Sequence, residues 1–260
     1  MKLERLFIFF IILLFVGAIL IINRFTSITE RKTKVYIQGA FYIDRNDIYR
    51  IVDDEMLEKM LRDVDPDILI VQEPVTFSDN LFEEFESEIS PSEKDSVINI
   101  YLKKIEDINS KLGFDIILLN VWDLESIQAR KNFYRKNRGD PNFKQKVDLY
   151  NKLNQIITTK IEELNLKKDI FTVNSSLFDN FKEIEGDYFS SVFGEELGLG
   201  DYKYMNKKYT DKILEIINED KKRKTLIIYD SNQKYELIKR LTSSPDINVI
   251  RIMSGEKNEN

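Results

Sequence analysis

The stretch DPDILIVQEP, residues 65–74, shows the pattern that decides the fold. Within it, Asp67–Gln72 forms a nearly continuous apolar run. Such a run is typical of a strand that is buried on both faces, as in a parallel sheet. Five other runs share this character, and we expect each of them to be a strand: Lys34–Ala40, Phe114–Asn120, Asp169–Val173, Thr225–Tyr229 and Asn248–Ile252.

Helical patterns separate these apolar runs. The clearest one places Leu57, Met60, Leu61 and Val64 at the i, i+3, i+4, i+7 spacing of an amphipathic helix. The alternation of strands and helices predicts a three-layer α/β fold, with a mostly parallel sheet flanked by helices. Helices are expected at Asp54–Val64, from the Ser90 capping box to about Leu112, from Asn142 to about Leu164, at Asp201–Glu219 and at Asn232–Leu241.

Three segments have a less regular pattern. Phe77–Ile89 is acidic and aromatic and is expected to be a loop or a short helix. Gly186–Gly200 contains Gly194, Gly198 and Gly200, and we expect a flexible loop there. It is not a phosphate-binding loop, because no strand leads into it and no Lys-Ser or Lys-Thr follows. The basic cluster Lys221–Lys224 is interpreted as a solvated helix end.

An uncharged apolar run, Leu6–Ile22, marks the N-terminus. At about 1.5 Å per residue it is just long enough to span the hydrocarbon core of a bilayer. No small-residue cleavage pattern follows Ala18, which favours an uncleaved signal anchor. We expect an anchor at residues 1–25, a tether at 26–33, one α/β domain at 34–254 and a disordered tail at 255–260. The short N-terminal tail favours an extracytoplasmic domain on a single-pass membrane protein, although the flanking positive charges are nearly balanced.

Composition excludes several classes of chemistry. The chain has 260 residues with no histidine and no cysteine. It therefore lacks a Ser-His-Asp triad, thiolate catalysis and any zinc site that uses His or Cys ligands. A metal site would consist of oxygen ligands only, which suits Mg²⁺, Ca²⁺ or Mn²⁺. The net charge of −6 argues against nucleic acid as a partner. We expect no cofactor and no tightly bound metal.

Polar residues follow several predicted strands, where ligands bind in open α/β sheets. Tyr42, Glu73, Asp123, Asp230 and Gln233 are candidate binding residues at this edge, and Glu73 and Asp230 are the candidate catalytic residues. Each also has a structural interpretation. Glu73 precedes Pro74 and could form a turn, Asp123 and Asp230 could cap helices, and Tyr42 could be a packing residue.

The same strand ends resemble the TraB/GumN (TIKI-like) superfamily, which has ChaN-like and erythromycin-esterase-like relatives. Its members carry a first strand ending in Gly-x-x-His, a second strand ending in Glu, an Arg-Asn pair on a helix, and a later strand ending in Gly-x-x-His. The corresponding segments here are KVYIQGAFY (Lys34–Tyr42), DPDILIVQEP (Asp65–Pro74), YMNKKYTDKILEII (Tyr204–Ile217) and TLIIYDSNQ (Thr225–Gln233). The resemblance covers both ends of the predicted domain and adds Asn206 to the candidate binding residues.

This chain departs from the family at the two histidine positions, which hold Tyr42 and Gln233. The metal-dependent hydrolysis that the resemblance implies rests on those histidines. We therefore expect a degenerate member that serves as a non-catalytic binding or interaction module. One alternative is a hydrolase in which Glu73 and Asp230, helped by Asp44 or Asp123, hold Mg²⁺ or Mn²⁺. Another is a sugar-nucleotide transferase that is tethered close to its membrane substrate.

Overall fold

A computed structural model describes residues 32–40, 54–72, 103–119, 124–166, 170–219 and 223–252. Residues 103–112 are helical. The named elements are β1 (Thr33–Ala40), α2 (Asp54–Val64), β2 (Ile68–Gln72), β3 (Asp115–Leu119), α4 (Leu124–Asn137), α5 (Pro141–Glu163), α6 (Ile170–Val173), α7 (Ser176–Leu197), the 3₁₀ turn η1 (Gly198–Gly200), α8 (Tyr202–Glu219), β4 (Thr225–Asp230), α9 (Lys234–Thr242) and β5 (Ile247–Arg251).

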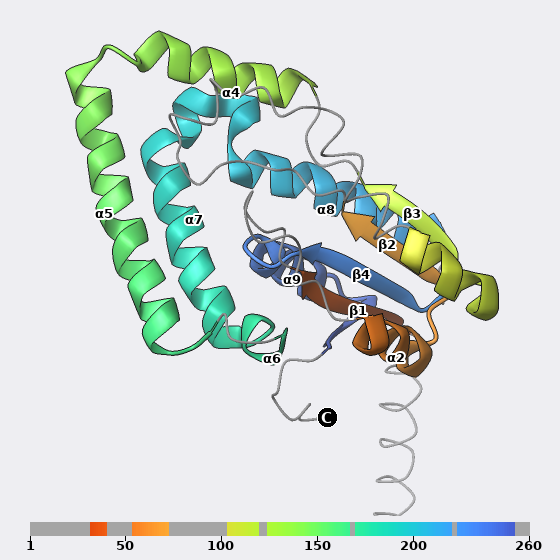
Figure 1. Cartoon of the computed structure of the whole chain (residues 1–260). Coiled ribbons are helices and arrows are strands. Elements are labelled where there is room, and N and C mark those ends of the chain that lie inside the picture. The colour runs from red at the N-terminus through yellow and green to blue at the C-terminus, as the bar shows by residue number, and fades with distance from the viewer. Residues whose placement is uncertain are drawn as a thin grey trace, which may run out of the picture.

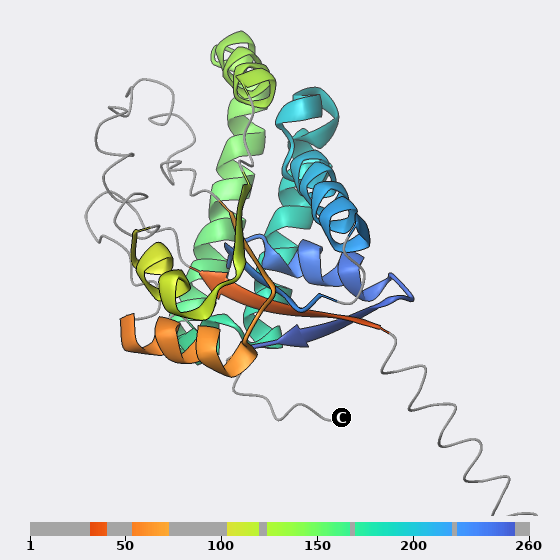
Figure 2. The same cartoon turned by 90° about the vertical axis from the view of Figure 1, so that its right-hand side faces the viewer.

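The strands form one five-stranded sheet in the order β3-β2-β4-β1-β5, seen from two directions in Figures 1 and 2. Every strand pairing in it is parallel. β4 is central, with Thr225 opposite both Val35 of β1 and Ile68 of β2. The predicted parallel α/β sheet is therefore confirmed, with five of the six expected strands present.

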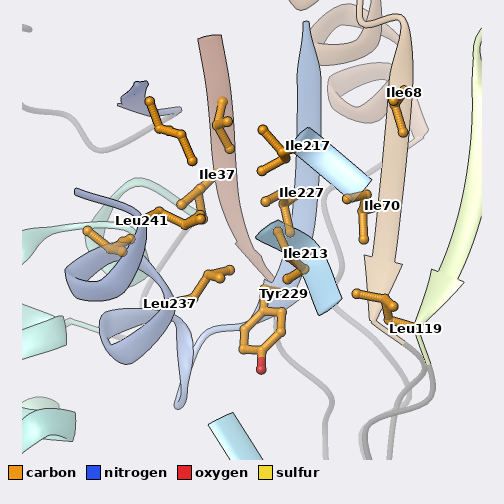
Figure 3. Packing of buried hydrophobic residues seen from close by; sticks show 13 residues of the cluster. Ile37, Ile68, Ile70, Leu119, Ile213, Ile217, Ile227, Tyr229, Leu237 and Leu241 are labelled. Atoms are coloured by element: carbon orange, nitrogen blue, oxygen red, sulfur yellow. The ribbon is translucent and has the colours of Figure 1, made fainter. Parts of the chain in front are cut away.

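Helices cover both faces of the sheet, which makes three layers. On one face, Ile213 and Ile217 of α8 and Leu237 and Leu241 of α9 pack on the strands, as Figure 3 shows. On the other face, α2 and the helix at 103–112 pack through a second cluster that includes Leu57, Met60, Leu61, Ile105, Leu69, Val71, Leu226 and Ile228. Each of β2 and β4 contributes alternate residues to the two clusters, which explains their continuous apolar sequences.

The connections that follow the neighbouring strands β1 and β4 lie on opposite faces of the sheet. The connection from β1 to β2 contains α2, which packs on one face of the sheet, and the connection from β4 to β5 contains α9, which packs on the other. Crossovers of one hand that step in opposite directions along a sheet pass over opposite faces. The carboxyl ends of β1 and β4 are therefore the position where this topology places a ligand crevice.

A group of helices extends beyond the sheet. Helices α4, α5 and α7 pack around a cluster of aromatic side chains, and Figure 1 shows α5 and α7 side by side. Most ring pairs are edge-to-face, such as Phe133–Phe143 at 5.4 Å and Tyr150–Phe189 at 5.3 Å between centroids. Edge-to-face contacts are favourable because they bring the positive ring edge to the negative ring face.

The predicted strand at Asp169–Val173 is wrong. Residues Ile170–Val173 form the short helix α6, closed by the Asn174 side chain, whose Nδ2 donates to the Ile170 carbonyl at 2.8 Å. The Ser175 hydroxyl likewise donates to the Thr172 carbonyl at 2.6 Å. A short apolar run does not distinguish a strand from a buried helical turn. Here the side chains of Asn174 and Ser175 stabilise the helical turn through hydrogen bonds to its carbonyl groups.

The flexible loop expected at Gly186–Gly200 is also wrong. This segment forms the second half of α7 and then η1. Phe189, Phe193 and Leu197 follow each other at four-residue spacing and are all buried in the aromatic cluster. Gly186 permits a close approach, since a Cβ at this position would overlap the hydroxyl of Tyr235 on α9.

The basic cluster at residues 221–224 has a different role where the structure describes it. Arg223 and Lys224 precede β4 and bind the amino ends of β2, which is next to β4, and of β3, the strand beyond β2. The interpretation as a solvated helix end is therefore wrong for these two residues. The backbone N–H of Lys224 donates to the Asp67 carboxylate at 2.6 Å, and Arg223 pairs with Asp115 at 2.6 Å. Two strands that are distant in sequence are thus joined to β4 at its start.

Several predictions fall on residues outside the described ranges. They include the membrane span at 6–22, residues 26–31 of the tether, the start of the helix at Ser90, the segment Phe77–Ile89 and the tail at 255–260. The last residue of the predicted tether, Thr33, is the first residue of β1. Among the helices of the described ranges, none is long and apolar enough to cross a membrane.

The contact between Gly186 and Tyr235 gives a stability prediction. Helix propensity alone would make Gly186→Ala more stable by about 1 kcal/mol. We expect a loss of about 1–2 kcal/mol, because the new methyl group displaces a buried tyrosine. Urea unfolding of the full-length chain in detergent measures the change. Adding Tyr235→Phe removes the overlapping hydroxyl and should recover most of the loss, and a stabilised Gly186→Ala variant would contradict this packing.

Candidate functional site

The structure describes three of the six predicted binding residues, Asn206, Asp230 and Gln233. The other three, Tyr42, Glu73 and Asp123, lie outside the described residues, as does Asp44. The carboxyl edge of the sheet can therefore be built from β1, β4, α8 and α9, together with the polar side chains that pack against them.

Asp230 ends β4 and organises the turn that follows. Its Oδ1 accepts a hydrogen bond from the Asn232 backbone N–H at 2.9 Å, and its own N–H donates to Oε1 of the buried Gln72 at 2.7 Å. Burial raises the pKa of Asp230 to about 6, although the Asn232 hydrogen bonds and the charges of Lys182 and Lys234 oppose the shift. A carboxyl group with this pKa can exchange a proton near neutral pH.

Asn206 lies in the interior of the fold. It is buried on α8, where its Oδ1 accepts a hydrogen bond from the Tyr229 hydroxyl at 3.3 Å. Figure 3 shows Tyr229 at the end of its cluster, with the hydroxyl directed away from the apolar side chains. Burial raises the pKa of Tyr229 well above its ordinary value, so the phenol stays protonated. Asn206 thus satisfies a buried hydroxyl of the sheet.

Gln233 lies in the turn between β4 and α9. Its backbone N–H donates to the Asp230 carbonyl at 3.0 Å, and its side chain makes no capping bond to the helix. The helix begins at Lys234, two residues later than predicted. Asp230 stabilises the turn through Asn232 and does not cap α9, which corrects the expected N-cap.

A buried ion cluster, which the sequence did not reveal, occupies the carboxyl ends of β1 and β5. It consists of Lys234, Asp179 and Arg251, from α9, α7 and β5. The Lys234 ammonium forms an ion pair with Oδ1 of Asp179, and Nη1 of Arg251 lies 3.0 Å from the other carboxylate oxygen. Lys234 is 1 % exposed and Asp179 is 3 % exposed, so their charges are held out of water.

Burial lowers the pKa of Lys234, and the neighbouring Asp179 carboxylate opposes this shift. The ammonium also lies 5.8 Å from the centre of the Phe178 ring, whose face favours a cation. No local pattern indicates this cluster, since Asp179 and Lys234 are 55 residues apart. The only signal in the sequence is a lysine directly after the DSNQ turn.

The side chains of Lys234 and Asn174 fill the space over Gly39 at the end of β1. A Cβ on Gly39 would come within 2.7 Å of the Lys234 side-chain carbons and within 2.9 Å of the Asn174 Oδ1 atom. That oxygen accepts a hydrogen bond from the Gly39 N–H at 2.6 Å. The β1 side of the expected crevice is therefore occupied by protein side chains.

Two buried polar atoms near these strand ends, Oε1 of Gln38 and Oγ of Ser231, have no hydrogen-bond partner among the described residues. Within those residues, no group of three or more carboxylates is placed to hold a metal ion. The chain was also compared with known proteins. No family model, no curated protein and no solved structure matches it.

The ion cluster predicts a large loss of stability when one partner is removed. Lys234→Met keeps most of the side-chain volume but leaves the buried Asp179 with one cation. We expect unfolding free energy to fall by about 3 kcal/mol, because a buried charge loses its main counterion. Lys239→Met is the matched control, since this α9 lysine pairs with Glu183 at the exposed surface and should contribute below about 1 kcal/mol. Equal losses in urea unfolding would contradict a structural role for Lys234.

Asp230 predicts a pH dependence of stability. Its pKa of about 6 in the folded chain exceeds the ordinary value of 3.8, so folding favours the protonated carboxyl. This contribution is present at low pH and is lost as the pH rises through about 6. We expect wild type to lose about 2 kcal/mol of unfolding free energy relative to Asp230→Asn between about pH 4 and pH 7. A difference that stays constant across this range would refute the shift.

Proposed function

We propose that this chain is a membrane-anchored binding or interaction module that derives from a TraB/GumN-like hydrolase and has lost its catalysis. The observation that carries this proposal is the filled space over Gly39, where Lys234 and Asn174 occupy the β1 side of the crevice. An open α/β sheet normally receives its ligand at this position. In this chain the same position holds the Lys234 side chain, whose buried ion pair with Asp179 joins α9 and α7 at the end of the sheet.

The sequence supports the same proposal at the two histidine positions of the family. Tyr42 and Gln233 replace the groups on which metal-dependent hydrolysis would rest. Neither phenol nor amide is a common ligand of transition metals, which prefer imidazole, thiolate or carboxylate. The proposed module is held at the membrane by residues 6–22, with its α/β domain on the extracytoplasmic side.

One observation favours a second function, a hydrolase that uses carboxylate ligands only. Asp230 has a pKa raised to about 6 at the end of the central strand, and perturbed carboxyl groups at such positions are frequent in active sites. In this alternative, Glu73 and Asp230 would hold Mg²⁺ or Mn²⁺, which would supply Lewis-acid activation of a water molecule. The cation would itself lower the pKa of Asp230 on binding, because it stabilises the ionised carboxylate.

The melting temperature of the full-length chain in detergent separates the two functions. It is measured with and without millimolar Mg²⁺, Mn²⁺, Ca²⁺ and Zn²⁺, for wild type, Glu73→Gln and Asp230→Asn. A ligand that binds only the folded state raises the melting temperature. For a binding module without a metal centre, we expect that none of these ions shifts the melting temperature of wild type or of either variant.

The controls distinguish a specific site from general cation binding. Asp211→Asn removes an exposed carboxylate from α8 and should never change a metal response. A rise with Mg²⁺ or Mn²⁺ that survives in Asp211→Asn but disappears in Glu73→Gln and Asp230→Asn would overturn the binding module and establish a carboxylate metal centre. A rise that all variants share would reflect cation binding elsewhere.

A further inference from the structure

Helices α5 and α7 form an antiparallel hairpin. The Tyr150 hydroxyl donates to the Glu185 carboxylate at 3.1 Å, and Lys146 pairs with Glu196 at 3.0 Å near one end. At the other end, Ile161 and Phe178 belong to one buried cluster. Residues with higher numbers in α5 therefore contact residues with lower numbers in α7. Figure 1 shows the two helices running alongside each other.

Each helix of this hairpin exposes an apolar stripe. Leu149 and Ile156 of α5 are 49 % and 60 % exposed, and Leu177 and Ile184 of α7 are 45 % and 53 % exposed. In each pair the residues are seven positions apart, which places them two helical turns apart on one face. Large aliphatic side chains at this spacing are typical of a helix that packs against another helix.

The two stripes lie on the same side of the hairpin. In both helices each exposed apolar residue comes one position before a residue that faces the partner helix, as Leu149 precedes Tyr150 and Ile184 precedes Glu185. One position is a rotation of about 100° around the helix axis. Because the helices run antiparallel, this rotation directs both stripes to one side. Leu153 and Phe181, which lie between the exposed residues of their stripes, are partly buried against the same cluster. We call the face made by these six residues the hairpin face.

Charges beside the hairpin face differ between the two helices. Apart from the buried Asp179, helix α7 carries five acidic side chains and one lysine, whereas α5 carries four lysines and three acidic side chains. Lys146 lies near the start of α5, and Glu195 lies near the end of α7, so both are at the same end of the antiparallel pair. A surface with one basic and one acidic edge is complementary to a copy of itself that is turned by half a revolution.

We propose that the hairpin face binds the hairpin face of a second copy of this chain, with α5 of each copy against α7 of the other. The two-fold axis then runs parallel to the helices, and four antiparallel helices surround the apolar stripes. This arrangement brings Lys146 toward Glu195 of the second copy. The other two-fold arrangement, with α5 against α5, would bring Lys146 toward Lys160 and is disfavoured by repulsion.

The hairpin is large enough for this dimer. Two helices of about 20 residues cover roughly 30 Å by 20 Å, or about 600 Å² on each copy. This area is at the lower limit of stable protein interfaces, so a dissociation constant in the micromolar range is expected. The proposed dimer does not depend on what the strand ends bind. The metal experiment above tests Glu73 and Asp230 at the strand ends, whereas the dimer involves α5 and α7.

Sedimentation of the full-length chain in detergent tests the dimer, with the mass followed over a range of concentrations. Wild type should form dimers, and Ile156→Glu combined with Ile184→Glu should weaken the association by at least about 100-fold. Tyr204→Glu is the matched control, because Tyr204 is a similarly exposed side chain, 45 %, on α8. The predicted anchor is the same in every variant, so a change in mass reports on the hairpin.

A charge exchange tests the pairing of α5 with α7. Lys146→Glu and Glu195→Lys should each weaken the dimer, and the double variant should restore it. The absence of cysteine in the chain allows a second test with two single variants, Leu149→Cys and Tyr188→Cys, which should form a mixed disulfide dimer after oxidation.

Three outcomes would overturn the proposal. One is a monomeric wild type at all concentrations, and another is a dimer that the Ile156→Glu, Ile184→Glu variant leaves unchanged. The third is a monomer that binds lipid vesicles through Ile156 and Ile184, which would assign the hairpin face to the membrane surface.

Discussion

The ion pair between Lys234 and Asp179 connects the sheet with the helices that extend beyond it. Removing two charges from water costs several kcal/mol each, and only a close counterion offsets this cost. The pair therefore constrains the positions of α9 and α7 directly. It also constrains β1, because the Lys234 side chain packs over Gly39 at the end of that strand. Arg251 adds β5 to the same constraint, and Asn174 adds α6 through its bond to Gly39.

The sheet could be predicted from the sequence because its strands are buried on both faces. A strand such as Ile68–Gln72 must be apolar at every position that faces a helix layer, and this requirement leaves a continuous run that periodicity detects. The same criterion failed at Ile170–Val173, where burial of a helical turn produces an equally apolar run. It also failed in α7, whose glycines indicate loops by propensity but lie in a helix that packs closely on its neighbours. In both places, contacts with distant residues override the local preference.

The candidate site was predictable only in part, for a related reason. The rule that ligands bind at carboxyl strand ends selected Asp230, whose burial and raised pKa come from its position at the end of β4. The same rule selected Gln233, which lies in the turn between β4 and α9. The family resemblance added Asn206, whose side chain accepts a hydrogen bond from the buried hydroxyl of Tyr229. The ion cluster was missed because pairs such as Asp179 and Lys234 have no fixed sequence spacing. Only the folded backbone brings them together, so no motif could have indicated them.

The two hydrophobic cores differ in composition, and this difference separates their roles. The sheet core consists mostly of Ile, Leu and Val, whose branched side chains fit the pleated surfaces on which α8 and α9 pack. Helices α4, α5 and α7 form a helical extension beyond the sheet, and the core of this extension is aromatic. Large rings in edge-to-face contact can hold three helices together with few residues. Arg130 joins this core to the sheet side of the molecule, since its buried guanidinium lies 4.4 Å from the ring centre of Tyr202 at the start of α8. Because the helical extension has its own core, its outer surface is not needed to cover the sheet. Apolar residues on that surface therefore require a reason other than the folding of the sheet, which is the physical basis for assigning them to association.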